Sequence, residues 1–284
     1  MPSSASASSA GSTPAEPGHR IAVGRTAEVF AHGENRVLKI LRPGFPDALG
    51  EEEAVAAAMA DAARVGAPRF FGITRVDGRI ALIYERRHGP SMLERLIARP
   101  WTAHRLGTML GELHATMHDA PAPSLPDLAA TFREAVRGAE ADAGADAAAR
   151  ALDRIEALPA GDSLCHGDFH PGNVVMSASG PAVIDWLTAG SGPPAADVAR
   201  TLFLLRDGRM PPDRSALRRQ LTVLLRQRFS AAYLAAYRRR RALDLEEVAA
   251  WRLPILVARL DEGIEDERAH VRALIDDELA TAEG

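Results

Sequence analysis

The sequence contains very little cysteine and lysine. Of its 284 residues only Cys165 is a cysteine, and of its 34 lysines and arginines only Lys39 is a lysine. A single cysteine excludes a disulfide within the chain and is typical of a reducing compartment, so we expect a cytoplasmic protein. No stretch approaches the roughly 20 consecutive apolar residues of a membrane-spanning helix, and no signal peptide is recognisable, so no membrane partner is expected.

An excess of positive charge is also absent. The formal net charge is -4 with neutral histidines. A surface that neutralises the phosphates of a nucleic acid needs many basic residues, so nucleic acid is not an expected partner. Hydrophobic residues make up 46% of the chain and charged residues 25%, which is typical of a soluble globular protein with one large core or two smaller ones.

Two rare residue types occupy positions that invite a chemical explanation. A sequence that otherwise uses only arginine replaces lysine wherever a surface charge is sufficient. A compact ammonium group, however, fits between phosphates and a carboxylate better than a planar guanidinium does. Chance is the alternative explanation for the single Lys39. Asparagine occurs only as Asn35, in a predicted turn, and as Asn173.

The chain divides into a polar tail, a β-rich unit and a helical unit. Residues 1–19, mainly Ser, Ala, Pro and Gly, predict a disordered tail. Residues 20–87 contain short β-prone runs between turn residues, which predict five strands of an antiparallel sheet and a helix over about 51–64. Residues 88–284 are mainly helical in pattern. The sequence therefore predicts an α+β fold with two lobes.

Apolar residues at helical spacing mark the expected helices of the second unit. These cover residues 101–118, 126–157, 215–237, 244–260 and 265–280. One β-prone segment rich in glycine and proline, 164–192, interrupts them.

This interrupting segment carries the chemistry. It reads LCHGDFHPGNVVM, then a turn, then AVIDW, and so presents Asp168, Asn173 and Asp185 in a loop, strand, turn, strand order. Phosphoryl transfer to an alcohol needs a carboxylate that orients and deprotonates the hydroxyl, and oxygen ligands for Mg²⁺. Carboxylate and amide oxygens suit magnesium better than histidine or cysteine would.

HGDFHPGN followed by VIDW resembles the catalytic loop and metal motif of the aminoglycoside phosphotransferase and choline kinase-like family. The resemblance implies a bilobal protein-kinase-like fold, with a nucleotide-binding lobe at 20–87 and a helical lobe at 88–284 that holds the catalytic loop and the acceptor site. It implies Asp168 as the catalytic base, and Asn173 and Asp185 as metal ligands. The implied reaction is Mg-dependent transfer of the γ-phosphoryl group of ATP or GTP to a small-molecule hydroxyl, an aminoglycoside-type antibiotic being one candidate acceptor.

The same resemblance places Lys39, in the strand VLKI, against the α- and β-phosphates. Its partner should be an acid on the following helix, where residues 51–53 are all glutamate. Spacing does not choose among them. Members of the family tend to place this acid directly before a small residue, which favours Glu53. Stabilisation of the helix start by its dipole is the alternative role for each of these glutamates.

The resemblance also assigns two further segments by their position in the chain. Gly24 and Thr26 lie between the first two strands, where a phosphate-covering loop belongs, although one glycine is also what an ordinary hairpin turn contains. Glu85 and Arg86 leave the last strand of the first lobe, where the resemblance places the hinge whose backbone meets the purine.

Other interpretations of the same residues remain open. A regulatory module of this fold could bind nucleotide without catalysis. A metal-dependent hydrolase could use His166, Asp168 and His170, although zinc would need further ligands and both histidines could simply brace the loop. The resemblance to the kinase fold implies that Asp197 is a structural brace of the catalytic loop. Acids within 261–267 either attract a cationic acceptor or are balanced by nearby arginines.

Overall fold

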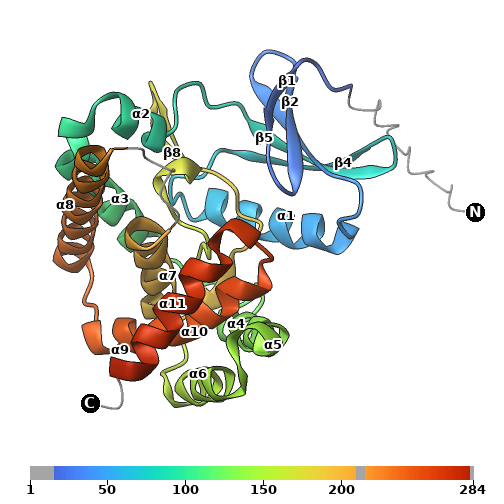
Figure 1. Ribbon diagram of the computed structural model, residues 1–284. Coiled ribbons are helices and arrows are strands. Elements are labelled where there is room, and N and C mark those ends of the chain that lie inside the picture. Colours follow the sequence, from blue (N-terminus) through green and yellow to red (C-terminus); the bar gives the residue numbers. More distant parts are fainter. Residues whose placement is uncertain (1–15, 209–214, 282–284) are drawn as a thin grey trace, which may run out of the picture.

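The computed structural model describes residues 16–208 and 215–281. The predicted tail, 1–19, lies largely outside these residues. The described part is an α+β structure in which a five-stranded antiparallel sheet and one helix stand beside a larger helical body (Figure 1). None of the helices in the described ranges is long and apolar enough to cross a membrane.

The sheet has the strand order β1-β2-β3-β5-β4, and every neighbouring pair is antiparallel. Its strands are β1 (Arg20–Val23), β2 (Ala27–His32), β3 (Arg36–Leu41), β4 (Phe70–Val76) and β5 (Arg79–Glu85). Helix α1 (Asp47–Ala62) packs against the sheet. Its Gly50 lies so close to Ile80 that any side chain at position 50 would push the Ile80 side chain away. This helix begins at Asp47, earlier than the predicted start near residue 51.

The helical body holds the remaining long elements. Its helices are α2 (Met92–Ala98), α3 (Ala103–Met117), α4 (Leu128–Gly138), α5 (Glu140–Ala143), α6 (Ala145–Ala157), α7 (Pro194–Arg206), α8 (Ala216–Arg240), α9 (Leu245–Ala250), α10 (Arg252–Asp261) and α11 (Glu265–Thr281), with 3-10 turns η1 (Pro100–Thr102) and η2 (Pro171–Asn173). The single helix predicted over 126–157 is wrong: three helices occupy this range, with Gly144 at φ 90 between α5 and α6. The helix predicted over 244–260 is likewise two helices, and Pro254 lies in the first turn of the second, where no N–H donor is needed.

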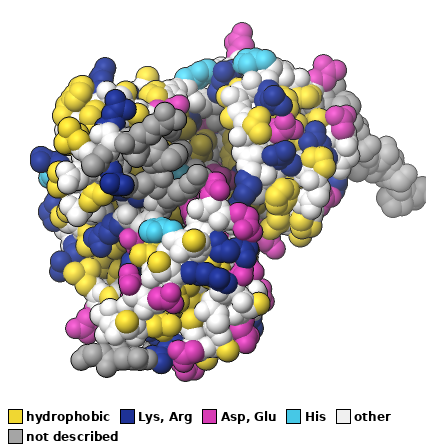
Figure 2. Space-filling model, in the orientation of Figure 1, with side chains coloured by type: hydrophobic (Ala, Val, Ile, Leu, Met, Phe, Trp, Pro, Cys, Tyr) yellow, Lys and Arg dark blue, Asp and Glu magenta, His cyan; other side chains and the backbone are white. Residues whose placement is uncertain are grey.

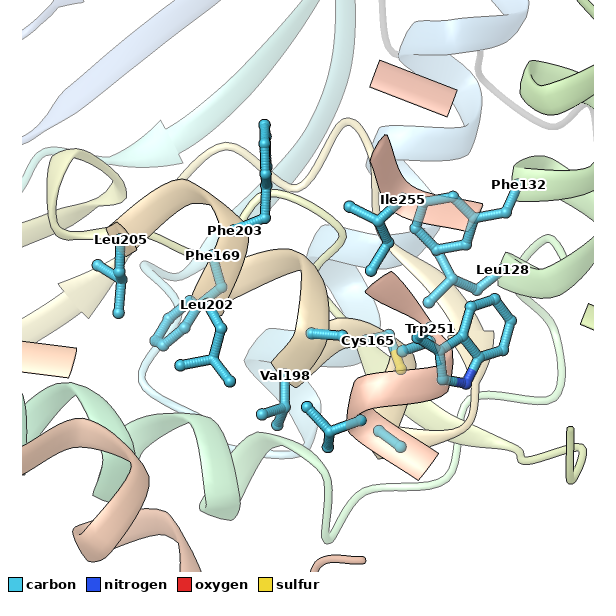
Figure 3. Close-up of a cluster of buried hydrophobic side chains, with 14 of the residues drawn as sticks. Leu128, Phe132, Cys165, Phe169, Val198, Leu202, Phe203, Leu205, Trp251 and Ile255 are labelled. Carbon is cyan, nitrogen blue, oxygen red and sulfur yellow. The ribbon is translucent and has the colours of Figure 1, made fainter. Parts of the chain in front are cut away.

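One hydrophobic core joins most of these helices. Phe169 lies beside Leu202 and Leu205 of α7, while Trp251 and Phe132 pack together farther away (Figure 3). Because Phe169 directly follows Asp168 in sequence and is completely buried, the core fixes the backbone beside that carboxylate.

Short strands frame the segment that carries Asp168, Asn173 and Asp185. β6 (Ser163–Cys165) pairs with β9 (Gly190–Gly192), and β7 (Val174–Ser177) pairs with β8 (Gly180–Val183). Between β6 and β7 the chain forms a loop that ends in η2, and between β8 and β9 lies Asp185. The two hairpin-like pairings therefore bring both acidic segments to one place.

Candidate active site

Lys39 lies at the centre of a cluster of charges between the sheet and the segment that carries Asp168 and Asp185. It comes from β3, where its neighbours Leu38 and Ile40 are buried in the core of the sheet. The Nζ atom of Lys39 lies 2.7 and 2.8 Å from the two carboxylate oxygens of Glu53 on α1, and 2.6 Å from Oδ1 of Asp185. These three oxygens use all three N–H donors of the ammonium group.

Tyr84 completes this buried cluster, and the sequence did not reveal it. Its hydroxyl donates a hydrogen bond of 2.9 Å to Oε1 of Glu53. Burial disfavours the charge of Lys39, but the carboxylates of Glu53 and Asp185 outweigh it and raise the pKa of Lys39 above its usual value. The signal for Tyr84 is strand register: it lies two residues from Leu82, which pairs with Lys39, and so on the same face of β5.

Asp168 projects from the loop between β6 and η2 and is held by several polar groups. Its backbone carbonyl accepts a hydrogen bond of 2.9 Å from Nδ2 of Asn173, and Nδ2 lies 3.4 Å from Oδ2 of Asp168. His170 lies 3.5 Å from the same Oδ2, and Arg200 4.0 Å from Oδ1. Burial would raise the pKa of Asp168, but His170, Arg200 and His166 together hold it well below its ordinary value.

Asp185 adopts a backbone conformation that few non-glycine residues adopt. Its φ is 68, in the left-handed region. The preceding residue, Ile184, donates a backbone hydrogen bond of 2.9 Å to the carbonyl of Asn173, and the following Trp186 is buried with its Nε1 bonded to the carbonyl of Val183. The neighbours thus hold the carboxylate of Asp185 in place beside Lys39 at a conformational cost of about 1–3 kcal/mol, as is common in functional sites.

The donor set fits a hard divalent cation. The carbonyl of Asp168 can only accept a hydrogen bond, so the amide atom facing it is nitrogen, and the side-chain oxygen of Asn173 is left for a cation. Asp185 adds carboxylate oxygens from the adjacent strand end. Oxygen ligands of this kind suit Mg²⁺.

The two histidines on either side of Asp168, His166 and His170, form hydrogen bonds with backbone groups. His166 is completely buried; its Nδ1 accepts from the backbone N–H of Asp168, and its Nε2 bonds the carbonyl of Ile184. Nδ1 of His170 accepts from the N–H of Gly172. With both nitrogens of His166 engaged, the alternative of a His166, Asp168, His170 metal site finds no support in the geometry.

A family model described as the phosphotransferase enzyme family matches residues 18–275, most of the chain. The chain belongs to this family. No protein in a search of curated sequences matches it.

Several solved structures have the same kinase-like fold as this phosphotransferase, although their sequence identity to it is low. An aminoglycoside-3'-phosphotransferase of type VIII aligns with a TM-score of 0.58 and 21% identity, covering 84% of this chain and 93% of that one. A choline/ethanolamine kinase family protein from Mesorhizobium loti gives 0.54 and 18%, covering 97% and 90%. Amicoumacin kinase hAmiN, in complex with AMP-PNP, Ca²⁺ and Ami, gives 0.60 and 14%, covering 90% and 87%. These likenesses show the fold alone.

Asp197, at the start of α7, lies beneath the loop that carries Asp168 in this phosphotransferase. Its oxygens accept hydrogen bonds from the backbone N–H groups of His166 at 2.6 Å and Gly167 at 3.0 Å. His114 on α3 and His118, which directly follows this helix, place their Nε2 atoms 3.0 and 3.2 Å from the same carboxylate. Asp197 is therefore a brace of the loop, as its position in the sequence indicated.

The role of the two histidine partners of Asp197 was not predicted from the sequence. Nδ1 of His114 lies 2.7 Å from the hydroxyl of Tyr233, and Nδ1 of His118 lies 2.6 Å from that of Tyr237. Together with Asp197 the histidines form the one group of three potential metal ligands among the described residues. Both nitrogens of each ring already have partners, so the group is a hydrogen-bond network. The spacing of four residues between the histidines, which puts them on one face of a helix, was the available signal.

The segments assigned by position take up ordinary backbone roles. Gly24 and Thr26 lie in the turn between β1 and β2, where the N–H of Gly24 bonds the carbonyl of Ala27. At the end of β5, the N–H of Glu85 donates to the carbonyl of Arg69 and that of Arg86 to the carbonyl of Asn35. A purine bound beside this segment would therefore have to use other backbone groups.

Three of the five acids within residues 261–267 form ion pairs with arginines. Glu262 contacts Arg200 and Arg259, Glu267 contacts Arg259, and Glu265 contacts Arg268. The space-filling view shows basic and acidic side chains intermixed over this part of the molecule (Figure 2). A cationic acceptor would have to compete with these arginines for the carboxylates.

Proposed function

We propose that this protein is a Mg-dependent kinase that transfers the γ-phosphoryl group of ATP or GTP to a hydroxyl of a small molecule. The observation that carries the proposal is the meeting of Lys39 and Asp185 at 2.6 Å, with Asp168 and Asn173 on the adjoining loop. These groups come from three separate stretches of sequence. A structural ion pair has no need to collect the ammonium, carboxylates and amide that phosphoryl transfer uses.

In this proposal each side chain has one task. Lys39, oriented by Glu53, neutralises the phosphates of the nucleotide. Asn173 and Asp185 would hold Mg²⁺, which when bound supplies positive charge to the transferring phosphoryl group. Asp168 accepts a hydrogen bond from the acceptor hydroxyl and takes its proton as the new bond forms. Gly24 and Thr26 would cover the phosphates, and Glu85 and Arg86 would border the purine.

The low pKa of Asp168 bears on its task. A carboxylate held in its charged form is a weak base toward an unreacted alcohol, so Asp168 orients the hydroxyl first and takes the proton late. A loose transition state, in which most bond breaking precedes bond formation, is compatible with such a late transfer.

The acceptor is proposed only as a small-molecule alcohol. Two structurally similar phosphotransferases have been solved in complex with an aminoglycoside, one with GDP and kanamycin and the other with ADP and streptomycin. In this chain the pairing of Glu262, Glu265 and Glu267 with arginines weakens the case for an aminoglycoside, because it leaves those carboxylates already neutralised.

Release of nucleoside diphosphate from Mg-ATP and Mg-GTP, measured with pools of hydroxylated metabolites and antibiotics, tests the proposal. The wild-type protein should show acceptor-dependent turnover that requires Mg²⁺, and Asp168→Ala should lose it. Equal turnover by wild type and Asp168→Ala would contradict the assignment of the base. Mg-dependent nucleotide binding without turnover over a wide acceptor panel would instead support the inactive regulatory module.

A further inference from the structure

A buried arginine lies between the proposed base and a second carboxylate. Arg200, on α7, has a side chain that is only 7% exposed. One of its terminal nitrogens lies 2.5 Å from Oε1 of Glu262 and 4.0 Å from Oδ1 of Asp168. The guanidinium is therefore hydrogen-bonded to Glu262 and only faces Asp168.

Glu262 is itself held firmly. Its other oxygen, Oε2, accepts a hydrogen bond of 2.5 Å from Arg259 on α10, and Arg259 also donates to Glu267 at 2.8 and 2.9 Å. The guanidinium carbons of Arg200 and Arg259 lie 5.8 and 5.7 Å from the centroid of the Phe203 ring, within the range of cation–π contacts. Figure 3 shows Phe203 on α7.

The two oxygens of Asp168 thus have different surroundings. Oδ2 lies near Asn173 and His170, while Oδ1 faces the guanidinium of Arg200 without a hydrogen bond to it. A buried arginine and a carboxylate at this separation would ordinarily close to a charge-assisted bond of about 2.8 Å. Here the guanidinium makes its hydrogen bond to Glu262 instead.

We propose that Glu262 is a positioning residue of phosphoryl transfer: by binding Arg200 it keeps the guanidinium from capping the Asp168 oxygen that must receive the acceptor proton. The inference rests on the proposed kinase function. In the reaction the acceptor oxygen forms a bond to the γ-phosphorus and its proton passes to Asp168. The bond between the γ-phosphorus and the bridging oxygen breaks, and its electron pair leaves with the nucleoside diphosphate.

The test compares Glu262→Gln, Arg200→Gln and the double variant with wild type. In Glu262→Gln the freed Arg200 should close onto Asp168, so kcat should fall about tenfold or more while KM for the nucleotide stays within about twofold. In the Arg200→Gln background the same change at Glu262 should alter kcat by less than about twofold, because Glu262 acts only through Arg200. Glu262→Asp, which keeps the carboxylate, should recover part of the activity.

Glu267→Gln is the matched control, because Glu267 is also a partner of Arg259 but does not contact Arg200. Its kcat should stay near that of wild type. Thermal midpoints of all variants separate loss of folding from loss of positioning. Equal kcat in wild type and Glu262→Gln, or independent effects that multiply in the double variant, would overturn the proposal.

The inference can fail separately from the proposed function. Turnover is followed with an acceptor found by screening and also with water as the acceptor. If wild type releases no diphosphate in either assay, the kinase function is contradicted. Crystal structures of wild type and Glu262→Gln then decide the inference. A shortening of the distance from Arg200 to Asp168 to a direct hydrogen bond supports it, and an unchanged distance overturns it.

Discussion

At the residue scale, the environment of Lys39 accounts for a lysine in a sequence that otherwise uses arginine. Its ammonium group is surrounded by three carboxylate oxygens at 2.6–2.8 Å, and its side chain is 11% exposed. A guanidinium is larger and planar, and it cannot direct three donors to oxygens grouped around one nitrogen. The shape of the site, as well as its charge, therefore selects lysine.

Lys39→Arg should consequently weaken binding of Mg-ATP about tenfold or more although it preserves the charge. The added atoms have to displace Glu53 or Asp185, and both neighbours belong to the proposed nucleotide site. Isothermal titration calorimetry measures the change. Arg36→Lys, an exchange in the opposite direction at an exposed position of the same strand, should leave the affinity unchanged. Equal binding by Lys39→Arg and wild type would contradict the account of this site.

The protonation of His114 should make the stability of the protein depend on pH. Burial and the neighbouring His118, opposed in part by Asp197, lower the pKa of His114 from 6.5 to about 4. Between pH 6.5 and 4 the unfolded chain therefore binds a proton that the folded protein does not. Stability should fall as the pH drops through this window, by on the order of 3 kcal/mol from this group.

Urea unfolding at pH 7 and pH 4.5 checks this dependence. His114→Asn keeps an N–H donor for Asp197 but does not titrate. It should be less stable than wild type at pH 7 and should lose less stability on acidification. The same loss in both proteins would show that other groups are responsible.

Among the secondary-structure elements, helices α3 and α8 pack closely together at two glycines of α3. A Cβ atom at Gly107 would meet the backbone carbonyl of Phe229, and one at Gly111 would meet that of Tyr233, closer than atoms can approach. This close approach lets His114 on α3 and His118 at its C-terminal end reach the tyrosines of α8. Helix packing thus determines the geometry of the network beneath the catalytic loop.

Gly111→Ala should therefore destabilise the protein by about 1–3 kcal/mol, because the obstructing atom belongs to the backbone and cannot rotate away. Chemical denaturation gives the free energy of unfolding. Glu112→Ala, at the adjacent exposed position of α3, should change it by less than about 0.5 kcal/mol. A stability gain in Gly111→Ala, as expected for glycine replaced in an isolated helix, would contradict the close packing.

Elements were predictable from sequence to different extents. The five strands follow the alternation of β-prone runs and turns, and the structure confirms an α+β fold with an antiparallel sheet. The run from 126 to 157 appeared as one helix because apolar spacing continues through it. Gly144, whose φ of 90 ends α5, was the overlooked signal.

At the scale of the whole molecule, the proposed site depends on contacts between distant parts of the chain. Lys39 contacts Asp185, which lies 146 residues later in the sequence. Both residues could be proposed from the sequence, because few residue types can neutralise phosphates or bind a metal ion in this way. The supporting groups were not readable. Tyr84 and Arg200 acquire their roles from strand register and helix placement, and their residue types are common ones for buried or surface positions.

The role of Asp168 as the base is tested most directly by measuring nucleotide binding and phosphoryl transfer on the same samples of wild type and Asp168→Asn. Asp168→Asn should bind Mg-ATP within about threefold of wild type, because Lys39, Asn173 and Asp185 remain. It also predicts that the variant transfers phosphate to the acceptor at least about a hundredfold more slowly, because the amide cannot take the proton. Undiminished transfer by Asp168→Asn would contradict the claim that this carboxylate is the base.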